Sequence, residues 1–146
     1  MIYPNSVNNS LYTLLSSDSV LISSNVTVEL NTLYNLDPNR TPWVGIYNND
    51  IIIEPHRVQK PNPWMTTYQP LIYVQDIRYD DEQIVNDRTN DLLTAVLSAI
   101  NSESNRNLGG SVDIVKGFQI SPFELDIEDD TSIYAYEIIM TADKRA

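Results

Sequence analysis

The feature that most constrains the fold is an apolar stripe between residues 85 and 100 that repeats every three or four residues. Its members are Val85, Thr89, Leu92, Leu93, Val96, Leu97 and Ile100. This spacing predicts an amphipathic helix whose stripe is wide enough to lie on a β-sheet. Asp80 is placed to cap the helix, and Gln83, three residues later, completes a capping box. The chain therefore contains one long helix that needs a sheet to cover its apolar side.

Strands are predicted on both sides of this helix. Leu71–Tyr79 carries apolar residues on both of its faces, which favours a central strand. After the helix, Leu108-Gly109-Gly110 allows a sharp turn. Val112–Ile120 and Ile133–Thr141 then follow as strands that we expect to pair antiparallel as a terminal hairpin.

The first third of the chain predicts further elements. Ser6–Ser23 has helical spacing that breaks near Ser16-Ser17-Asp18, which indicates one helix and a short helical turn. Val26–Leu30 reads as a strand. Trp43–Tyr47 and Asp50–Glu54 are β-rich runs separated by two asparagines, and we expect them to form a hairpin.

Four prolines distinguish the segment from Pro55 to Pro70. Because proline donates no backbone hydrogen bond, we expect a long loop or an extended edge arm here. Within an acidic chain the segment combines positive charge with large apolar groups, in His56, Arg57, Lys60, Trp64, Met65 and Tyr68. Such side chains are enriched in interface centres, so one hypothesis is a docking arm and the alternative is a variable surface loop.

The length of 146 residues bounds the number of domains. It suffices for one hydrophobic core of ordinary size and is too short for two. The expected fold class is α+β, with an antiparallel or mixed β-sheet packed against an N-terminal helix and the long amphipathic helix. We expect residues 1–146 to form a single domain that ends in the β-hairpin.

Charge and composition exclude several classes of function. The chain has 20 acidic and 9 basic side chains and a formal charge of −11, which disfavours tight binding to nucleic acid. It has no cysteine, so disulfides, thiolate ligands and thiol nucleophiles are ruled out. The N-terminus lacks the pattern of a signal peptide, and no apolar run has the length of a membrane span. We expect a soluble protein without a membrane partner.

The candidate chemical motifs favour no enzyme. His56 is the single histidine and has no Gly-x-Ser-x-Gly motif to accompany it, so neither a nucleophile–base pair nor a zinc site is predicted. A second candidate is an acidic run, which comprises Glu124, Asp126, Glu128, Asp129 and Asp130. It lacks the glycine of a calcium-binding loop, which favours a solvated hairpin tip. We therefore expect no catalytic residue, no metal and no cofactor.

Several passages together resemble the tail terminator (tail completion) proteins of long-tailed bacteriophages. They are the N-terminal helix, Thr41-Pro42-Trp43-Val44-Gly45-Ile46-Tyr47, Ile72-Tyr73-Val74 running through Asp81-Glu82 into the long helix, and Asn107-Leu108-Gly109-Gly110-Ser111-Val112-Asp113. The last passage is similar to a leucine-glycine-glycine turn that follows the long helix in that family. The resemblance extends from about residue 6 to residue 141, and the proline-rich segment departs from it by its length.

The resemblance implies a structural role in a virion. Such a protein forms a hexameric ring that caps the tail tube, fixes tail length and meets the connector of the head, after assembly in the host cytoplasm. The implied partners are further copies of the chain, the tail tube protein and a head-side connector or stopper protein, while DNA only passes through the channel. On this hypothesis the acidic run lines or rims the ring. Alternatives are a head-completion or stopper protein, a small hydrolase that uses His56, and a cytoplasmic ligand-binding domain.

Overall fold

The computed structural model describes residues 4–30, 42–55, 64–78, 82–102, 105–127 and 131–145. Within these ranges the helices are α1 (Pro4–Ser16), α2 (Ser19–Ser23), α3 (Glu82–Asn101) and a short 3-10 helix, η2 (Leu108–Gly110). The strands are β1 (Thr27–Leu30), β2 (Trp43–Tyr47), β3 (Ile51–Pro55), β4 (Trp64–Tyr68), β5 (Leu71–Arg78), β6 (Ile114–Ile127) and β7 (Thr131–Arg145). The α+β fold class predicted from the sequence is confirmed.

All of the described strands belong to one mixed sheet organised around the long strand β7. On one side β7 pairs antiparallel with β6 along nearly its whole length. On the other side it pairs first with β5 and then, toward the C-terminus, with β4. Beyond β5 lies β2, followed by β1 in parallel, and beyond β4 lies β3. The sheet therefore has three described outer strands, which are β1, β3 and β6.

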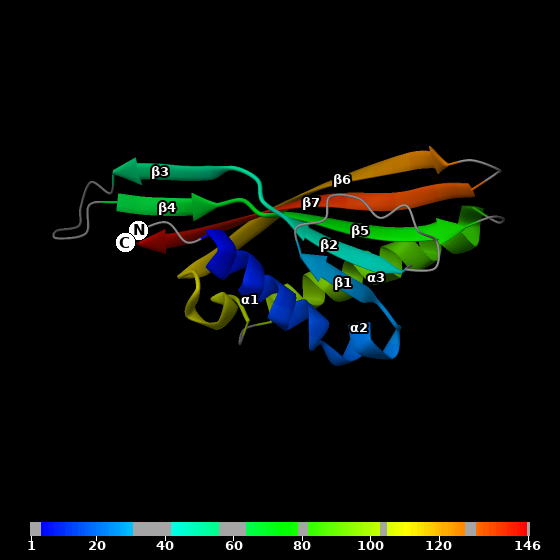
Figure 1. Ribbon diagram of the computed structural model, residues 1–146, viewed down its shortest axis with the longest axis horizontal. Helices are drawn as coiled ribbons and strands as arrows, with labels where there is room; N and C mark the ends of the chain where they lie inside the picture. The colour runs from blue at the N-terminus through cyan, green and yellow to red at the C-terminus, as the bar shows by residue number, and fades with distance from the viewer. Residues whose placement is uncertain are drawn as a thin grey trace.

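The helices cover one face of this sheet (Figure 1). Helix α3 packs on β5 and β7, and α1 packs on β1 and β2. The side chains between the two layers form the main core, which includes fully buried Val44, Ile72, Val96 and Ile138. Figure 1 also shows that β3 and β4 extend beyond the helices, together with the end of β7. The sheet is thus longer than the layer that covers it.

The break between α1 and α2 lies where the sequence predicts it. The Asp18 carboxylate accepts hydrogen bonds from the backbone N–H groups of Val20 and Leu21, each at 3.1 Å, and so caps α2. This is the usual function of aspartate at a helix N-terminus. The cap turns the chain between two short helices, and it places Leu15 and Leu21 in the same core.

The opposite face of the sheet has a smaller apolar cluster made by Trp43, Leu71 and Tyr73, with Ile139 against it. The indole of Trp43 lies over Gly45, since a Cβ atom built on that glycine would collide with the ring. Trp43 is fully buried, and its Nε1 has no hydrogen-bond partner among the described residues. Glycine is therefore required at position 45 for space, because any side chain would displace the ring.

Two predictions about the middle of the chain are wrong. Strands β2 and β3 do not form a hairpin with each other, because β2 pairs with β5 and β3 pairs with β4. Trp64–Tyr68, which the sequence analysis placed in a loop or edge arm, is instead strand β4, paired with β3 and β7. Its five residues contain no proline, so their donors are free to pair on both sides.

The other predicted elements are present with adjusted bounds. The predicted strand at Leu71–Tyr79 is β5, which is buried along most of its length. The terminal pair is longer than expected, since β6 continues to Ile127. Asp80 lies outside the described residues, so the capping box stays a prediction. No helix in the described ranges is long and apolar enough to cross a membrane.

Candidate functional site

The residues of the predicted docking arm are described only in part. His56, Arg57 and Lys60 lie outside the described residues. Trp64 begins β4, and Met65 beside it is half-buried. Tyr68 is only 3% exposed and packs in the main core, so its side chain stabilises the fold. A docking function for the remaining residues of this segment stays a prediction.

The acidic run is divided between β6 and residues outside the described ranges. Glu124 and Asp126 belong to β6, where they pair with Tyr134 and Ser132 of β7. The prediction that the run begins in a hairpin tip is wrong, because β6 continues to Ile127. Glu128, Asp129 and Asp130 lie outside the described residues. Within the described part of the chain, no group of three acidic or histidine side chains is placed to hold a metal ion.

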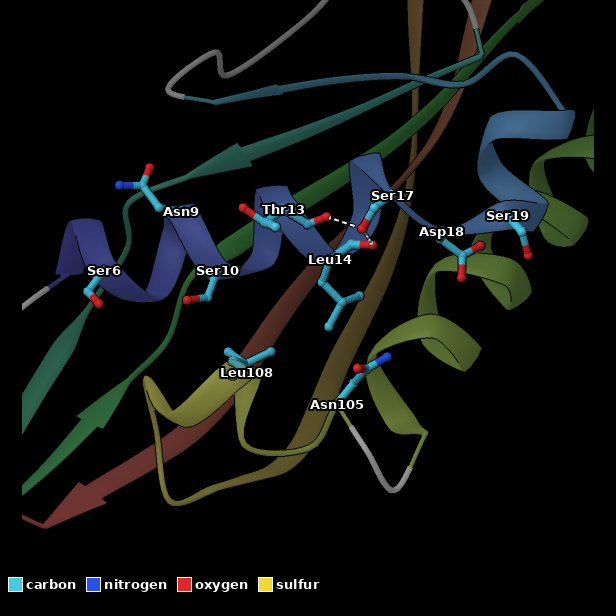
Figure 2. A pocket seen from close by; sticks show the side chains of 11 residues that line it. Ser6, Asn9, Ser10, Thr13, Leu14, Ser17, Asp18, Ser19, Asn105 and Leu108 are labelled. Carbon is cyan, nitrogen blue, oxygen red and sulfur yellow. Dashed lines mark hydrogen bonds between the residues drawn. The ribbon is translucent and has the colours of Figure 1, made fainter.

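A groove of about 870 Å³ runs along α1 (Figure 2). One wall is α1 with its junction to α2, and the other is the turn that contains Asn105 and Leu108. The lining residues are mostly small and polar: Ser6, Asn9, Ser10, Thr13, Leu14, Ser17, Asp18, Ser19, Asn105, Leu108 and Gly109. Across the groove, the hydroxyls of Ser10 and Ser111 hydrogen-bond to each other and join α1 to the turn.

The polar groups of this groove are largely engaged in holding the local structure. Ser17 donates its hydroxyl hydrogen to the carbonyl of Thr13, and Asn105 Nδ2 donates to Ala99 O at 2.8 Å. Asp18, the one charged residue among the described lining residues, caps α2. In the part of the chain that the structure describes, the residues that line this groove include no histidine, lysine or cysteine. Its groups suit hydrogen bonding better than activation of a nucleophile.

A buried carboxylate joins three strands near the end of β7. Asp143 is 8% exposed and accepts a hydrogen bond from Thr67 Oγ1 of β4 at 2.9 Å. It also pairs with Lys116 Nζ of β6 at 3.0 Å. This cluster could not be predicted from the sequence, because its members are far apart in the chain and none belongs to a local motif. Its contacts bind the extension of the sheet to β6.

A second ion pair joins the sheet to the long helix. Arg88 Nε of α3 lies 3.2 Å from Asp76 Oδ2 of β5, and the Asp76 side chain is 4% exposed. The hydroxyl of Tyr136 on β7 donates to Asn90 Oδ1 on the same helix. These contacts hold α3 on the sheet. They are structural and do not form a catalytic arrangement.

The outer edge of β6 is the clearest candidate for binding a partner. Met140 N donates to Pro70 O, so even-numbered residues of β7 direct their backbone groups toward the side of β5. The odd-numbered residues then face β6, where Ile139 is opposite Gln119 and Glu137 is opposite Ser121. Consequently the even-numbered residues of this part of β6, such as Phe118 and Ile120, direct their N–H and C=O groups away from the sheet.

Three features limit where the outer side of β6 is available for pairing. Near its start Val115 N donates to Arg106 O, which closes the edge beside an irregularity in the register between Val115 and Gly117. Pro122 occupies an outward position, so its missing N–H removes no bond to β7. Beyond Pro122 the sequence becomes acidic. Among the described residues, therefore, none pairs with the outer side of Gly117–Ser121, which carries no charge, and Ile120 is 38% exposed.

The comparisons with known proteins give little beyond this geometry. No family model matches the chain, and no curated protein matches it. Among solved structures, a chain from a particle described as "Virion of native gene transfer agent (GTA) particle" aligns with a TM-score of 0.48 and 10% identity, over 95% of this chain and 94% of that one. A likeness at this level carries no argument about function.

Proposed function

We propose that the chain is a structural subunit of a virion, of the tail terminator kind, which acts by assembly and not by turnover of a substrate. On this proposal copies form a ring, with six subunits as the resemblance implies, that caps the tail tube and ends its elongation. The ring then joins the tail to the head-side connector. The passages around Trp43 and Gly109 that resemble this family support the proposal.

The observation that carries the proposal is the open edge of β6. Unpaired backbone N–H and C=O groups on an exposed, apolar edge strand form a ready template for a strand of another chain. Monomeric proteins usually block such edges with charge, proline or a covering element. Here the blocking features flank Gly117–Ser121, and no described strand pairs with its outer side. An open edge of this kind suits a protein whose function is to join other chains.

The mass of the purified chain in solution tests the proposal. We expect light scattering to show a defined oligomer, either for the chain alone at high concentration or after addition of tubes assembled from the cognate tail tube protein. Negative-stain electron microscopy should then show rings, which are expected at the ends of the tubes. A chain that stays monomeric under both conditions, and leaves the tube ends bare, would contradict the proposal.

A further inference from the structure

We infer that the open stretch of β6, Gly117–Ser121, pairs with strand β3 (Ile51–Pro55) of a second copy of this chain. The inference rests on the proposed function, since it requires that copies associate. It goes further by naming the two strands that meet and the direction in which they run.

Strand β3 is a second outer strand, with no described strand on its outer side. Gln69 N donates to Asp50 O at 3.0 Å, so the even-numbered residues of this strand direct their backbone groups toward β4. Ile51 and Ile53 therefore direct theirs outward, as does Pro55. This proline lacks its N–H on the outer side, as Pro122 does in β6, so neither proline interrupts pairing within the subunit.

The side chains on the two edges also match. Ile53 is 44% exposed on β3, and Ile120 is 38% exposed on β6. On each strand the outward residues point their side chains to the helix-covered side, because Ile51 and Phe118 pack against the main core. Directly opposed residues of an antiparallel pair share a face. Pairing Ile53 with Ile120 therefore places two exposed isoleucines in contact.

The strand directions permit repetition of the same contact. Strand β3 runs antiparallel to β4, β4 to β7, and β7 to β6, so β6 runs antiparallel to β3. Two copies in the same orientation therefore bring β6 of one antiparallel to β3 of the next. All of the helices stay on one side of the extended sheet. A heterologous contact of this kind can repeat around a closed ring.

The contact also requires a displacement between neighbours. Thr66 is opposite Lys144, and Ile114 is opposite Asp143, so β3 lies level with the start of β6 in its own subunit. That start is closed by the bond from Val115 N to Arg106 O. The neighbour must therefore be shifted along the strands to reach Gly117–Ser121. In a ring closed through such shifted pairs, the strands are tilted relative to the ring axis, as they are in β-barrels.

Pairing of β6 with β6 of a second copy is the main competing arrangement. It would also be antiparallel, but a two-fold contact closes as a dimer and leaves β3 open in both copies. Pairing of β3 with β6 covers the outer sides of both of these strands in every subunit of a ring. We therefore assign β3 as the partner of β6.

Disulfide cross-linking tests the assignment directly, because the natural chain has no cysteine. Directly opposed, hydrogen-bonded residues of antiparallel strands have Cα atoms about 5.5 Å apart, which a disulfide can bridge. Oxidation of an equal mixture of the Ile53→Cys and Ile120→Cys variants should give cross-linked pairs that contain one copy of each. Each variant alone should give none. Cross-links in the Ile120→Cys variant alone would indicate the two-fold arrangement and overturn the assignment.

Proline substitution provides a second test that does not depend on thiol geometry. Ile120→Pro removes an outward N–H and should weaken self-association at least about tenfold, as measured by sedimentation equilibrium. Ile120→Val keeps the donor and the apolar side chain, and it should associate as the natural chain does. The circular dichroism spectrum of each variant reports whether it is folded. Ile22→Thr, which removes an exposed isoleucine of α2, serves as the surface control.

The outcomes separate this inference from the proposed function. Oligomers that form normally, with no cross-link in the mixture and no effect of Ile120→Pro, would overturn the β3–β6 contact and leave the proposed function standing. Failure of the natural chain to associate, alone or with tail tubes, would overturn both.

Discussion

Isoleucine occurs both under the helices and on the open strands, and the two settings differ sharply. Under α1 and α3, Ile46, Ile72 and Ile138 are fully buried between sheet and helices. On the outer strands, Ile53 and Ile120 remain 44% and 38% exposed. The first group lowers the free energy of the folded monomer by burial. The second group adds much less to monomer stability, and we propose that it is buried when copies pair.

The largest expected effect contrasts these two groups directly. Ile72→Ala should lower the free energy of unfolding by about 3 kcal/mol, because it leaves a cavity in the main core. Ile120→Ala should lower it by less than about 1 kcal/mol when the monomer is measured at low concentration. Urea denaturation followed by circular dichroism checks both values. Equal losses would show that β6 contributes to the core of the monomer.

A smaller effect tests the packing of the Trp43 cluster on the face of the sheet opposite the helices. Gly45→Ala should destabilise the fold by about 2 kcal/mol, since the added methyl group collides with the Trp43 indole. Gly117→Ala on β6 is the matched control, because a Cβ there meets no atom within 4 Å, and we expect a change below about 0.5 kcal/mol. Thermal unfolding measures the difference. If both variants melt alike, the indole does not lie over position 45.

The junction between β4 and β6 predicts a comparable or slightly smaller loss. Asp143→Ala removes the acceptor for Thr67 and the partner of Lys116, and it should cost about 1.5 to 2 kcal/mol. Asp91→Ala, at an exposed carboxylate on α3, should be neutral or slightly stabilising because alanine favours helix. Unfolding in urea compares the pair. A neutral result for Asp143→Ala would show that the cluster does not stabilise the extension.

The smallest effect concerns the cap of α2. Asp18→Ala should cost about 1 kcal/mol, since the N–H groups of Val20 and Leu21 lose their acceptor. Asp18→Asn retains a side-chain oxygen and should keep most of the stability. The thermal midpoints of the two variants supply the test. A loss as large for Asn as for Ala would show that the negative charge, and not the hydrogen bonds, is the main contribution.

The helices and the strand from Leu71 could be predicted because each follows a local sequence pattern. The stripe that includes Leu92, Val96 and Ile100 required a long helix, and the run from Leu71 required a buried strand. The break at Asp18 also followed from local signals, since its side chain can replace the missing helical acceptors. These features depend on neighbours within one helix turn or one strand.

Strand pairing was less predictable because it depends on residues far apart in the chain. Two asparagines between Trp43–Tyr47 and Asp50–Glu54 suggested a hairpin, but β2 and β3 pair with different strands. Because of the surrounding prolines, Trp64–Tyr68 was predicted as a loop or edge arm, but this proline-free segment is a strand that pairs on both sides. The open edge of β6 was missed for the same reason, since outward backbone groups are defined only after the register with β7 is known.

Residue-resolved hydrogen exchange of the β6 amides gives the most direct test of assembly through strand edges. In the monomer, the outward amides of Phe118 and Ile120 should exchange rapidly, while those of Gln119 and Ser121, bonded to β7, should be protected. In the assembled state the outward amides should become protected as well. Outward amides that exchange equally fast in the monomer and in the oligomer would contradict the account.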